Sequence, residues 1–146
     1  MQSEPTEKKV VVPIDGSESA LHALGVAAQR ARASGAALHL LNVQLPIASA
    51  MVRMFVSQGA IDRYYSEEAE RALGPARQML EKQDLPFQQS VRVGHPHEII
   101  AGYARTASGD EIVMGSRGMG LLGNLALGSV ATKVIHAAEV PVTVVK

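Results

Sequence analysis

Five glycines lie close together in the segment GSRGMGLLGNLALGSV, residues 115–130 of this chain. An apolar run, 112–114, precedes the segment, and apolar residues at helical spacing follow it over 130–138. A glycine-rich connection between a buried strand and a helix exposes backbone amides that can surround an anion, and the helix N-terminus adds partial positive charge. The segment therefore predicts a phosphate-binding loop. The alternative is a flexible surface loop, which would not need Gly115 and Gly118 at the strand end or Gly128 and Ser129 at the helix start.

Strand patterns and helix patterns alternate along the rest of the chain. Short apolar runs predict buried strands over 9–14, 36–43, 111–114 and 140–145. Strict alternation of apolar and polar residues over 87–93 predicts a half-exposed edge strand. We expect one domain, 8–146, behind a flexible polar tail, 1–7. Its expected fold is α/β, a doubly wound open sheet of five mostly parallel strands with four helices.

Local signals set the expected ends of the helices. The first helix should begin at an N-cap, Ser17, and stop at Gly35. A second should span 61–82 as one kinked helix, because its apolar stripe keeps phase across Pro75. A third should start at Pro96 and end at Gly109. The stretch 47–60 shows no clear period and receives no assignment.

This architecture predicts one composite pocket. In open parallel sheets, ligands bind outside the carboxyl ends of the strands, where the strand order reverses. Three connections leave carboxyl ends near that point if the first and fourth strands are neighbours: the turn Asp15-Gly16-Ser17, the residues after Val43, and the glycine segment.

The composition excludes several classes of function. Lys plus Arg and Asp plus Glu both number 14, so no net charge attracts nucleic acid or a membrane surface, and aromatics at 3% leave few platforms for stacking bases. The absence of cysteine excludes disulfides, thiolate metal sites and a cysteine nucleophile. No apolar run of about 18 residues and no secretion signal is evident. We therefore expect a cytoplasmic protein that neither binds nucleic acid nor inserts into membranes.

Three glycine motifs compete for residues 115–130. The phosphate loop of nucleoside triphosphatases needs a lysine directly after its last glycine, but Ser129 follows Gly128. The spacing of Gly118, Gly120 and Gly123 matches the dinucleotide fingerprint formally, yet it follows the fourth strand rather than the first, and no acidic strand end lies about 20 residues on. The third motif is two glycines three residues apart, nine intervening residues, and then Gly-Ser.

This third motif resembles the nucleotide-binding loop of the universal stress protein family, in its ATP-binding branch. The resemblance covers nearly the whole chain: VVPIDGSESA resembles the first strand and turn of the family, LHLLNV the second strand, and residues 115–146 the C-terminal third. It implies a sheet like that of the adenine nucleotide alpha hydrolases, which is Rossmann-like. It also implies bound ATP with Mg or Mn on its phosphates, and a homodimer paired through the strand that starts at Val140 and ends at Val145.

The resemblance also implies roles for individual residues. Asp15, in the turn with Gly16 and Ser17, would meet the ribose or a phosphate-bound metal, although a simple turn carboxylate remains the alternative. The other residues of the expected site would line the adenine, cradle the phosphates or flank them: Pro13, Ile14, Val43, Met114, Gly115, Arg117, Gly118, Gly128, Ser129 and Val130.

Catalysis receives little support from the residues. His95 and His97 form the only histidine cluster, and the intervening Pro96 indicates a helix start rather than a metal site. Asp15 and Arg117 are the only candidates to assist phosphoryl transfer, so we expect slow ATP hydrolysis at most and a nucleotide-dependent stress-response regulator. Two alternatives stay open: a dimeric interaction protein that binds no nucleotide, and an NAD-linked oxidoreductase.

Overall fold

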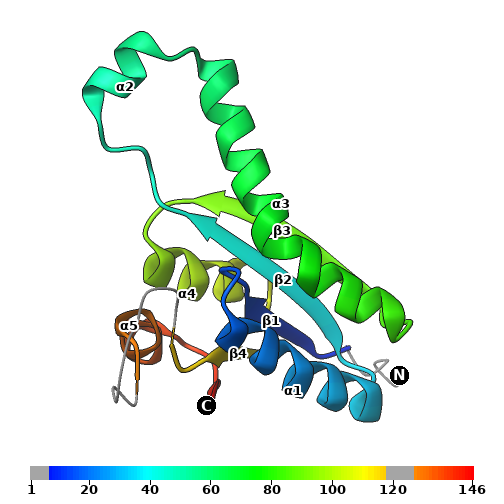
Figure 1. The fold of residues 1–146 in the computed structure, drawn as a ribbon. Coiled ribbons are helices and arrows are strands. Elements are labelled where there is room, and N and C mark those ends of the chain that lie inside the picture. The colour runs from blue at the N-terminus through cyan, green and yellow to red at the C-terminus, as the bar shows by residue number, and fades with distance from the viewer. Residues whose placement is uncertain (1–6, 118–126) are drawn as a thin grey trace, which may run out of the picture.

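The computed structural model describes residues 7–117 and 127–146. Most of the predicted tail, and Gly118 of the predicted loop, lie outside the described residues. The elements in chain order (Figure 1) are β1 (Lys9–Pro13), α1 (Glu18–Ser34), β2 (Ala37–Gln44), α2 (Ala50–Phe55), α3 (Gln58–Lys82), β3 (Phe87–Val93), α4 (Pro96–Thr106), β4 (Glu111–Gly115), α5 (Ser129–Ala137) and β5 (Val142–Val145).

The described strands form one sheet in the order β3-β2-β1-β4-β5, and every neighbouring pair is parallel. The chain adds β2 and β3 on one side of β1 and then crosses to add β4 and β5 on the other side. The strand order therefore reverses between β1 and β4, which meets the condition on which the expected composite pocket depends. The expected α/β doubly wound fold is confirmed, with all five strands parallel rather than most of them.

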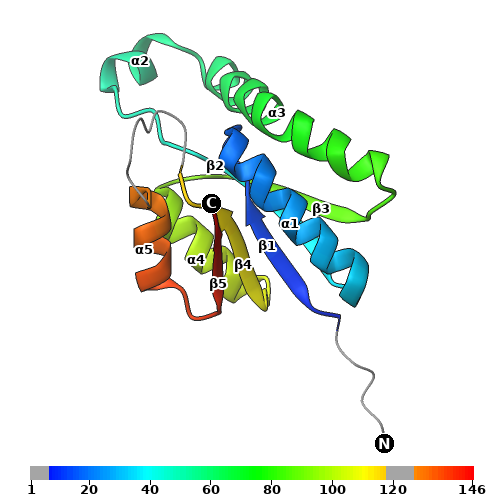
Figure 2. The same cartoon turned by 60° about the horizontal axis from the view of Figure 1, so that its bottom comes forward.

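Helices cover both faces of the sheet (Figure 2). On one face α1 and α3 pack over a core that includes Val12, Leu24 and Leu80. On the other face α4 and α5 pack over a second core that includes Leu41 and Val134. The buried positions of α1 include five alanines. Small side chains let this helix approach the sheet closely, so a chain with few aromatics still fills its core.

The predicted start and stop of α1 are confirmed. The Ser17 hydroxyl accepts a hydrogen bond from the Ala20 amide at 3.1 Å. Gly35 adopts a left-handed conformation (φ 77°) and donates its amide to the Ala31 carbonyl. The Ser17 cap lies in the β1–α1 turn at the carboxyl edge of the sheet, and the Gly35 cap ends the helix before β2.

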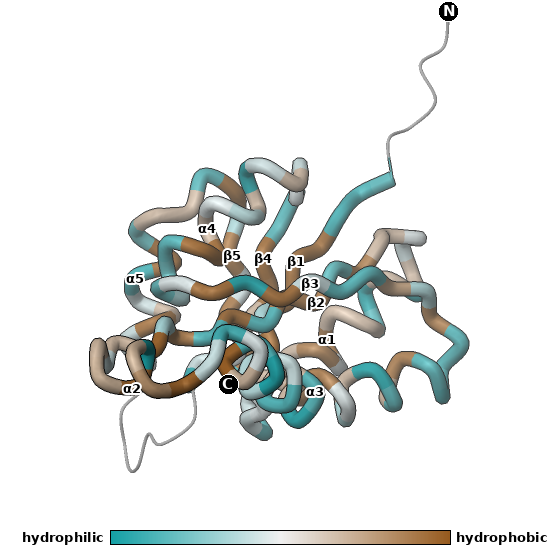
Figure 3. The backbone as a smooth tube through the Cα atoms, turned by 90° about the horizontal axis from the view of Figure 1, so that it is seen from above, coloured by the Kyte–Doolittle hydropathy of each residue, from teal (hydrophilic) through white to brown (hydrophobic). Residues whose placement is uncertain are grey.

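The stretch 47–60, which has no clear period, contains a short helix and the first turn of the next one. The six-residue α2 buries none of its residues. A helix without a buried face needs no apolar stripe, so periodicity in the sequence could not reveal it. It extends away from the sheet (Figure 1) and its tube carries hydrophobic colours in Figure 3. Met54 and Phe55 are 78% and 81% exposed. As predicted, α3 is one helix that continues through Pro75, although it starts at Gln58.

The end predicted for α4 is wrong. The helix ends at Thr106, and Ser108 takes the left-handed conformation (φ 55°) that usually favours glycine. Gly109 serves close packing instead, because a Cβ atom there would lie 2.9 Å from a Val11 methyl group. A structural reason for glycine at position 109 does exist, but it is a contact with a residue distant in the sequence rather than the end of a helix.

No helix in the described part of the chain is long and apolar enough to cross a membrane.

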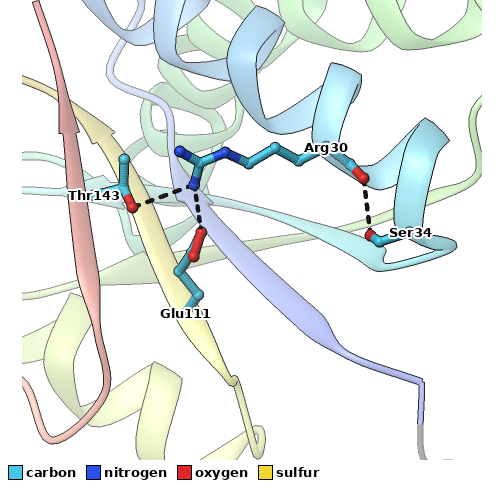
Figure 4. Close-up of polar contacts among 4 residues, drawn as sticks. All are labelled: Arg30, Ser34, Glu111 and Thr143. Atoms are coloured by element: carbon cyan, nitrogen blue, oxygen red, sulfur yellow. Dashed lines mark hydrogen bonds and ion pairs between the residues drawn. The ribbon is translucent and has the colours of Figure 1, made fainter.

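A polar cluster links α1 to the two strands beyond the reversal point (Figure 4). The Arg30 guanidinium donates to the Glu111 carboxylate at 3.0 Å and to the Thr143 hydroxyl at 3.3 Å. The Ser34 hydroxyl donates to the Arg30 carbonyl at 2.8 Å. Because the ion pair is half exposed, it orients α1 over β4 and β5 more than it stabilises the fold.

The end of β4 lies against the first turn of α1. A Cβ atom on Gly115 would lie 2.8 Å from both the carbonyl carbon and the carbonyl oxygen of Ser19. Both elements would have to separate to admit any side chain. Gly115 is therefore required for packing, independently of any ligand.

Substitution Gly115→Ala should lower the free energy of unfolding by about 1–3 kcal/mol, because the methyl group would meet backbone atoms that cannot move aside alone. Gly25→Ala is the matched control, since a Cβ atom at this α1 position meets nothing within 4 Å. That change should stabilise the protein by up to about 1 kcal/mol. Urea unfolding measures both, and equal effects of the two changes would contradict this account of Gly115.

His39 is a buried titratable residue in the middle of β2. Only 6% of it is exposed, and its Nδ1 atom has no hydrogen-bond partner in the described part of the chain. Burial, with a smaller effect of the Lys9 ammonium, lowers the pKa of His39 below its ordinary value, and the Glu7 carboxylate opposes this shift. The folded protein therefore holds this imidazole neutral where the unfolded chain would protonate it.

The lowered pKa predicts that acid weakens the fold. Below the ordinary histidine pKa of about 6.5 the unfolded chain binds the extra proton, so the free energy of unfolding falls with pH until the folded pKa is reached. His39→Leu should show a flatter dependence between pH 7.5 and 5 than the parent, in urea unfolding at each pH. Parallel curves for parent and variant would contradict the assignment.

Candidate functional site

A cavity of about 190 Å³ opens at the carboxyl edge of the sheet, where the strand order reverses between β1 and β4. It brings together the three connections that the sequence singled out: the β1–α1 turn, the end of β2, and both ends of the glycine segment. Its lining contains every predicted site residue except Gly16 and the undescribed Gly118, namely Pro13, Ile14, Asp15, Ser17, Val43, Met114, Gly115, Arg117, Gly128, Ser129 and Val130.

The lining also contains residues that the sequence reasoning missed: Ala20, Leu41, Pro96, Ile100, Ser116 and Ala131. Two of them, Pro96 and Ile100, come from the start of α4. A signal for them existed, because the β3–α4 connection also leaves the carboxyl edge of a parallel sheet. Only the packing of α4 across β2 brings this helix to the cavity.

Gly16 shapes the turn and does not line the cavity. It has a positive φ of 90°, which side chains rarely tolerate. Beside it the Asp15 carboxylate accepts a hydrogen bond from the Ser17 amide at 2.9 Å. The pair forms a tight Asx turn that presents Asp15 at the cavity wall.

Hydrogen bonds join the two ends of the glycine segment at its base. The Gly128 amide donates to the Ser116 carbonyl at 2.6 Å, and the Ser116 amide donates to the Val145 carbonyl at 2.9 Å. The Arg117 amide lies 3.4 Å from the Ser19 hydroxyl. The two described ends of the segment therefore lie close together, and hydrogen bonds join them to α1 and to the end of β5.

The N-terminus of α5 faces the cavity. Gly128 is its N-cap and offers no side-chain hydrogen bond, and no acidic residue stands in the first turn. The Thr132 amide donates to the Gly128 carbonyl as the first helical bond. The amides of Ser129, Val130 and Ala131 precede it, have no acceptor within the helix, and belong to lining residues. Free amides at a helix N-terminus are groups that can bind an anion.

Another part of the lining is apolar. Ile14 is buried, and its amide donates to the Leu41 carbonyl at 2.8 Å. Its carbonyl accepts a hydrogen bond from the Asn42 side chain at 2.9 Å. Gln44 donates to the Asn42 amide oxygen at 2.6 Å, which fixes the Asn42 side chain in turn. This chain of polar contacts joins the end of β1 to β2 beside the lining residues Ile14 and Val43.

The described residues offer no cluster of three histidine, cysteine or acidic side chains that could hold a metal ion. Pro96 occupies the first turn of α4 and His95 is its N-cap, so the interpretation of this motif as a helix start is confirmed.

Comparison with known proteins agrees with this arrangement. The family model of the universal stress protein family matches residues 7–146. A universal stress protein of Thermus aquaticus is 33% identical over 139 residues, which cover 95% of this chain and 98% of the relative.

Solved structures give the same result. Protein MJ0577 of Methanocaldococcus jannaschii superposes with a TM-score of 0.82 at 32% identity, covering 95% of both chains. A universal stress protein solved in complex with cAMP has a TM-score of 0.72 at 27% identity, covering 95% of this chain and 97% of its own. On this evidence the chain belongs to the universal stress protein family.

Proposed function

We propose that this protein binds an adenine nucleotide in the cavity between β1 and β4 and acts as a nucleotide-dependent regulator of the stress response. One observation carries the proposal: apolar side chains and a helix N-terminus with three unpaired amides line the same cavity. The first suits a nucleobase and the second a phosphate. The cAMP complex of a relative at 27% identity supports the same ligand class.

The base would lie against Pro13, Ile14 and Val43, and Asp15 would meet the ribose hydroxyls. The phosphates would lie at the start of α5, beside Ser129. Met114 and Val130 would flank the ligand, and the Arg117 guanidinium would add charge from the segment that Gly118 continues. The Gly128 amide already bonds the Ser116 carbonyl, so Gly128 would contribute space rather than a hydrogen-bond donor.

ATP is the nucleotide that the family resemblance implies, with Mg or Mn on its phosphates. Asp15 is the one carboxylate among the described lining residues, so it would approach such a metal together with the phosphate oxygens. No lysine and no histidine stands among those lining residues to assist transfer of the terminal phosphate. The proposed role is therefore binding that signals, with slow hydrolysis at most.

We also propose a homodimer paired through β5. This strand stands at the edge of the described sheet, and all four of its residues are half-buried. Because Pro141 and Val145 direct their carbonyls to β4, the alternate residues Val142 and Val144 direct theirs outward. An edge of this kind can pair with a second copy.

The proposed ligand also bears on localisation. Adenine nucleotides are metabolites of the cytoplasm, so we propose that the protein acts there.

Substitution Gly128→Val should reduce nucleotide affinity at least tenfold, because it adds bulk to the cavity lining beside the phosphate position. The backbone at Gly128 (φ −73°, ψ 164°) is one that valine adopts, so the fold should persist. Gly59→Val in α3, where a Cβ atom meets nothing within 4 Å, is the matched control. Isothermal titration calorimetry with ATP, AMP and NADH measures the effect. Unchanged affinity in a folded Gly128→Val protein, or binding of NADH alone, would overturn the proposal.

Substitution Val144→Pro should convert the dimer to a monomer, because proline removes an amide that points away from β4. Val144→Ala is the control, since it loses the same side-chain packing but keeps that amide. Light scattering after size-exclusion chromatography measures the mass of both variants. A dimer that survives Val144→Pro would assign its interface to another surface.

A further inference from the structure

The second edge of the described sheet is β3, which has seven residues where β5 has four. The Gly94 amide donates to the Gln44 carbonyl, so every second residue before Gly94 faces β2 and the alternate residues direct their backbone groups outward. The outward residues are Phe87, Gln89, Val91 and Val93. An edge with free amides and carbonyls can pair with another strand.

A second copy of this chain fits that edge. An antiparallel register centred on Ser90 would oppose Phe87 of one copy to Val93 of the other, and Val93 is 46% exposed. In the same register Arg92 would lie opposite Gln88, so no like charges would face each other. The strand contains no proline that would interrupt the ladder. The sequence of β3 is therefore compatible with pairing to itself.

Arg92, however, occupies an acceptor that such pairing needs. Its guanidinium donates to the outward Val91 carbonyl at 3.0 Å. It also lies over the Tyr103 ring of α4, with 5.5 Å between the guanidinium carbon and the ring centroid. The Tyr103 and Ser90 hydroxyls are 3.1 Å apart, which ties the ring to β3. Contacts to both β3 and α4 thus hold the guanidinium at the edge.

Every extended antiparallel register of two β3 strands uses the Val91 carbonyl. The centred register pairs Val91 with Gln89 of the second copy. A shift of two residues pairs it with Phe87 in one direction and with Val91 of the second copy in the other. Because such a pair has two-fold symmetry, both copies would have to release Arg92. The contact made by one side chain therefore opposes association twice.

The β5 edge differs. Between described residues, no side chain donates to the outward carbonyls of Val142 and Val144, and Arg30 contacts the Thr143 hydroxyl instead. We propose that Arg92 blocks pairing of β3 with a second copy and leaves β5 as the open edge. Two paired edges on each copy would continue the sheet from copy to copy without closure, whereas one paired edge ends the assembly at two copies.

Substitution Arg92→Thr tests the proposal in a Val144→Pro background, in which the β5 edge is blocked. Threonine suits an exposed strand, so the fold should persist. We expect Arg92→Thr to lower the monomer–dimer Kd at least tenfold, measured by sedimentation equilibrium. Arg105→Thr makes the same charge change on the exposed side of α4 and should leave the Kd unchanged. No tightening by Arg92→Thr, or an equal effect of Arg105→Thr, would overturn the proposal.

Substitution Val91→Pro identifies the surface that associates. The Val91 amide points away from β2, so proline removes a donor to a second copy without removing a hydrogen bond of the sheet. Added to Arg92→Thr in the same background, Val91→Pro should restore weak association, whereas Val91→Ala, which keeps the amide, should not. A dimer that survives Val91→Pro would place the association on another surface and overturn the proposal.

With the β5 edge intact, Arg92→Thr should form species larger than two copies, whose mass in light scattering rises with protein concentration. A mass equal to that of the parent at every concentration would contradict this expectation. The proposed β5 dimer is tested separately by Val144→Pro alone. If that change leaves the mass of the parent unaltered, the β5 dimer fails, and the comparison of Arg92→Thr with Arg105→Thr still decides the role of Arg92.

Discussion

Parallel pairing of β1 with β4 is the constraint on which the rest of this structure depends. Because of this pairing, β2 and β3 lie on one side of β1, and β4 and β5 lie on the other side. The helices that follow β1 and β4 therefore pack on opposite faces of the sheet. Their connections diverge at the carboxyl edge and leave a cavity that side chains from four connections line. The cavity is thus a consequence of topology.

Close approach of backbone to backbone then fixes the shape of this edge. Gly115 lies against Ser19, which holds the end of β4 to the first turn of α1. Ser116 carries the arrangement further, because its carbonyl binds Gly128 and its amide binds the end of β5. The base of the glycine segment is therefore coupled to the edge strand proposed to form the dimer.

The site relies on oriented amides rather than on formal charges. Asp15 and Arg117 cancel, and the first turn of α5 presents unpaired donors beside an apolar wall. Preorganised amides bind an anion without the desolvation cost of a buried lysine. Under the proposed function, such a site suits binding of a nucleotide phosphate more than acceleration of phosphoryl transfer, which requires charge at the outer phosphate.

The sequence by itself determined the fold class, the caps at Ser17 and Gly35, and the three connections that meet at the cavity. These features depend on local patterns: apolar runs, capping residues, and the rule that parallel strands end at one edge. The resemblance to a family added most of the individual lining residues. Why Gly109 is glycine was decided by contact with Val11, a residue distant in the sequence. The same holds for the approach of Pro96 and Ile100 to the cavity, for the requirement for Gly115 beside Ser19, and for the engagement of the Gly128 amide by Ser116. Only the tertiary structure decides such features, because a one-dimensional pattern records which residues can pack or donate but not which surface they meet.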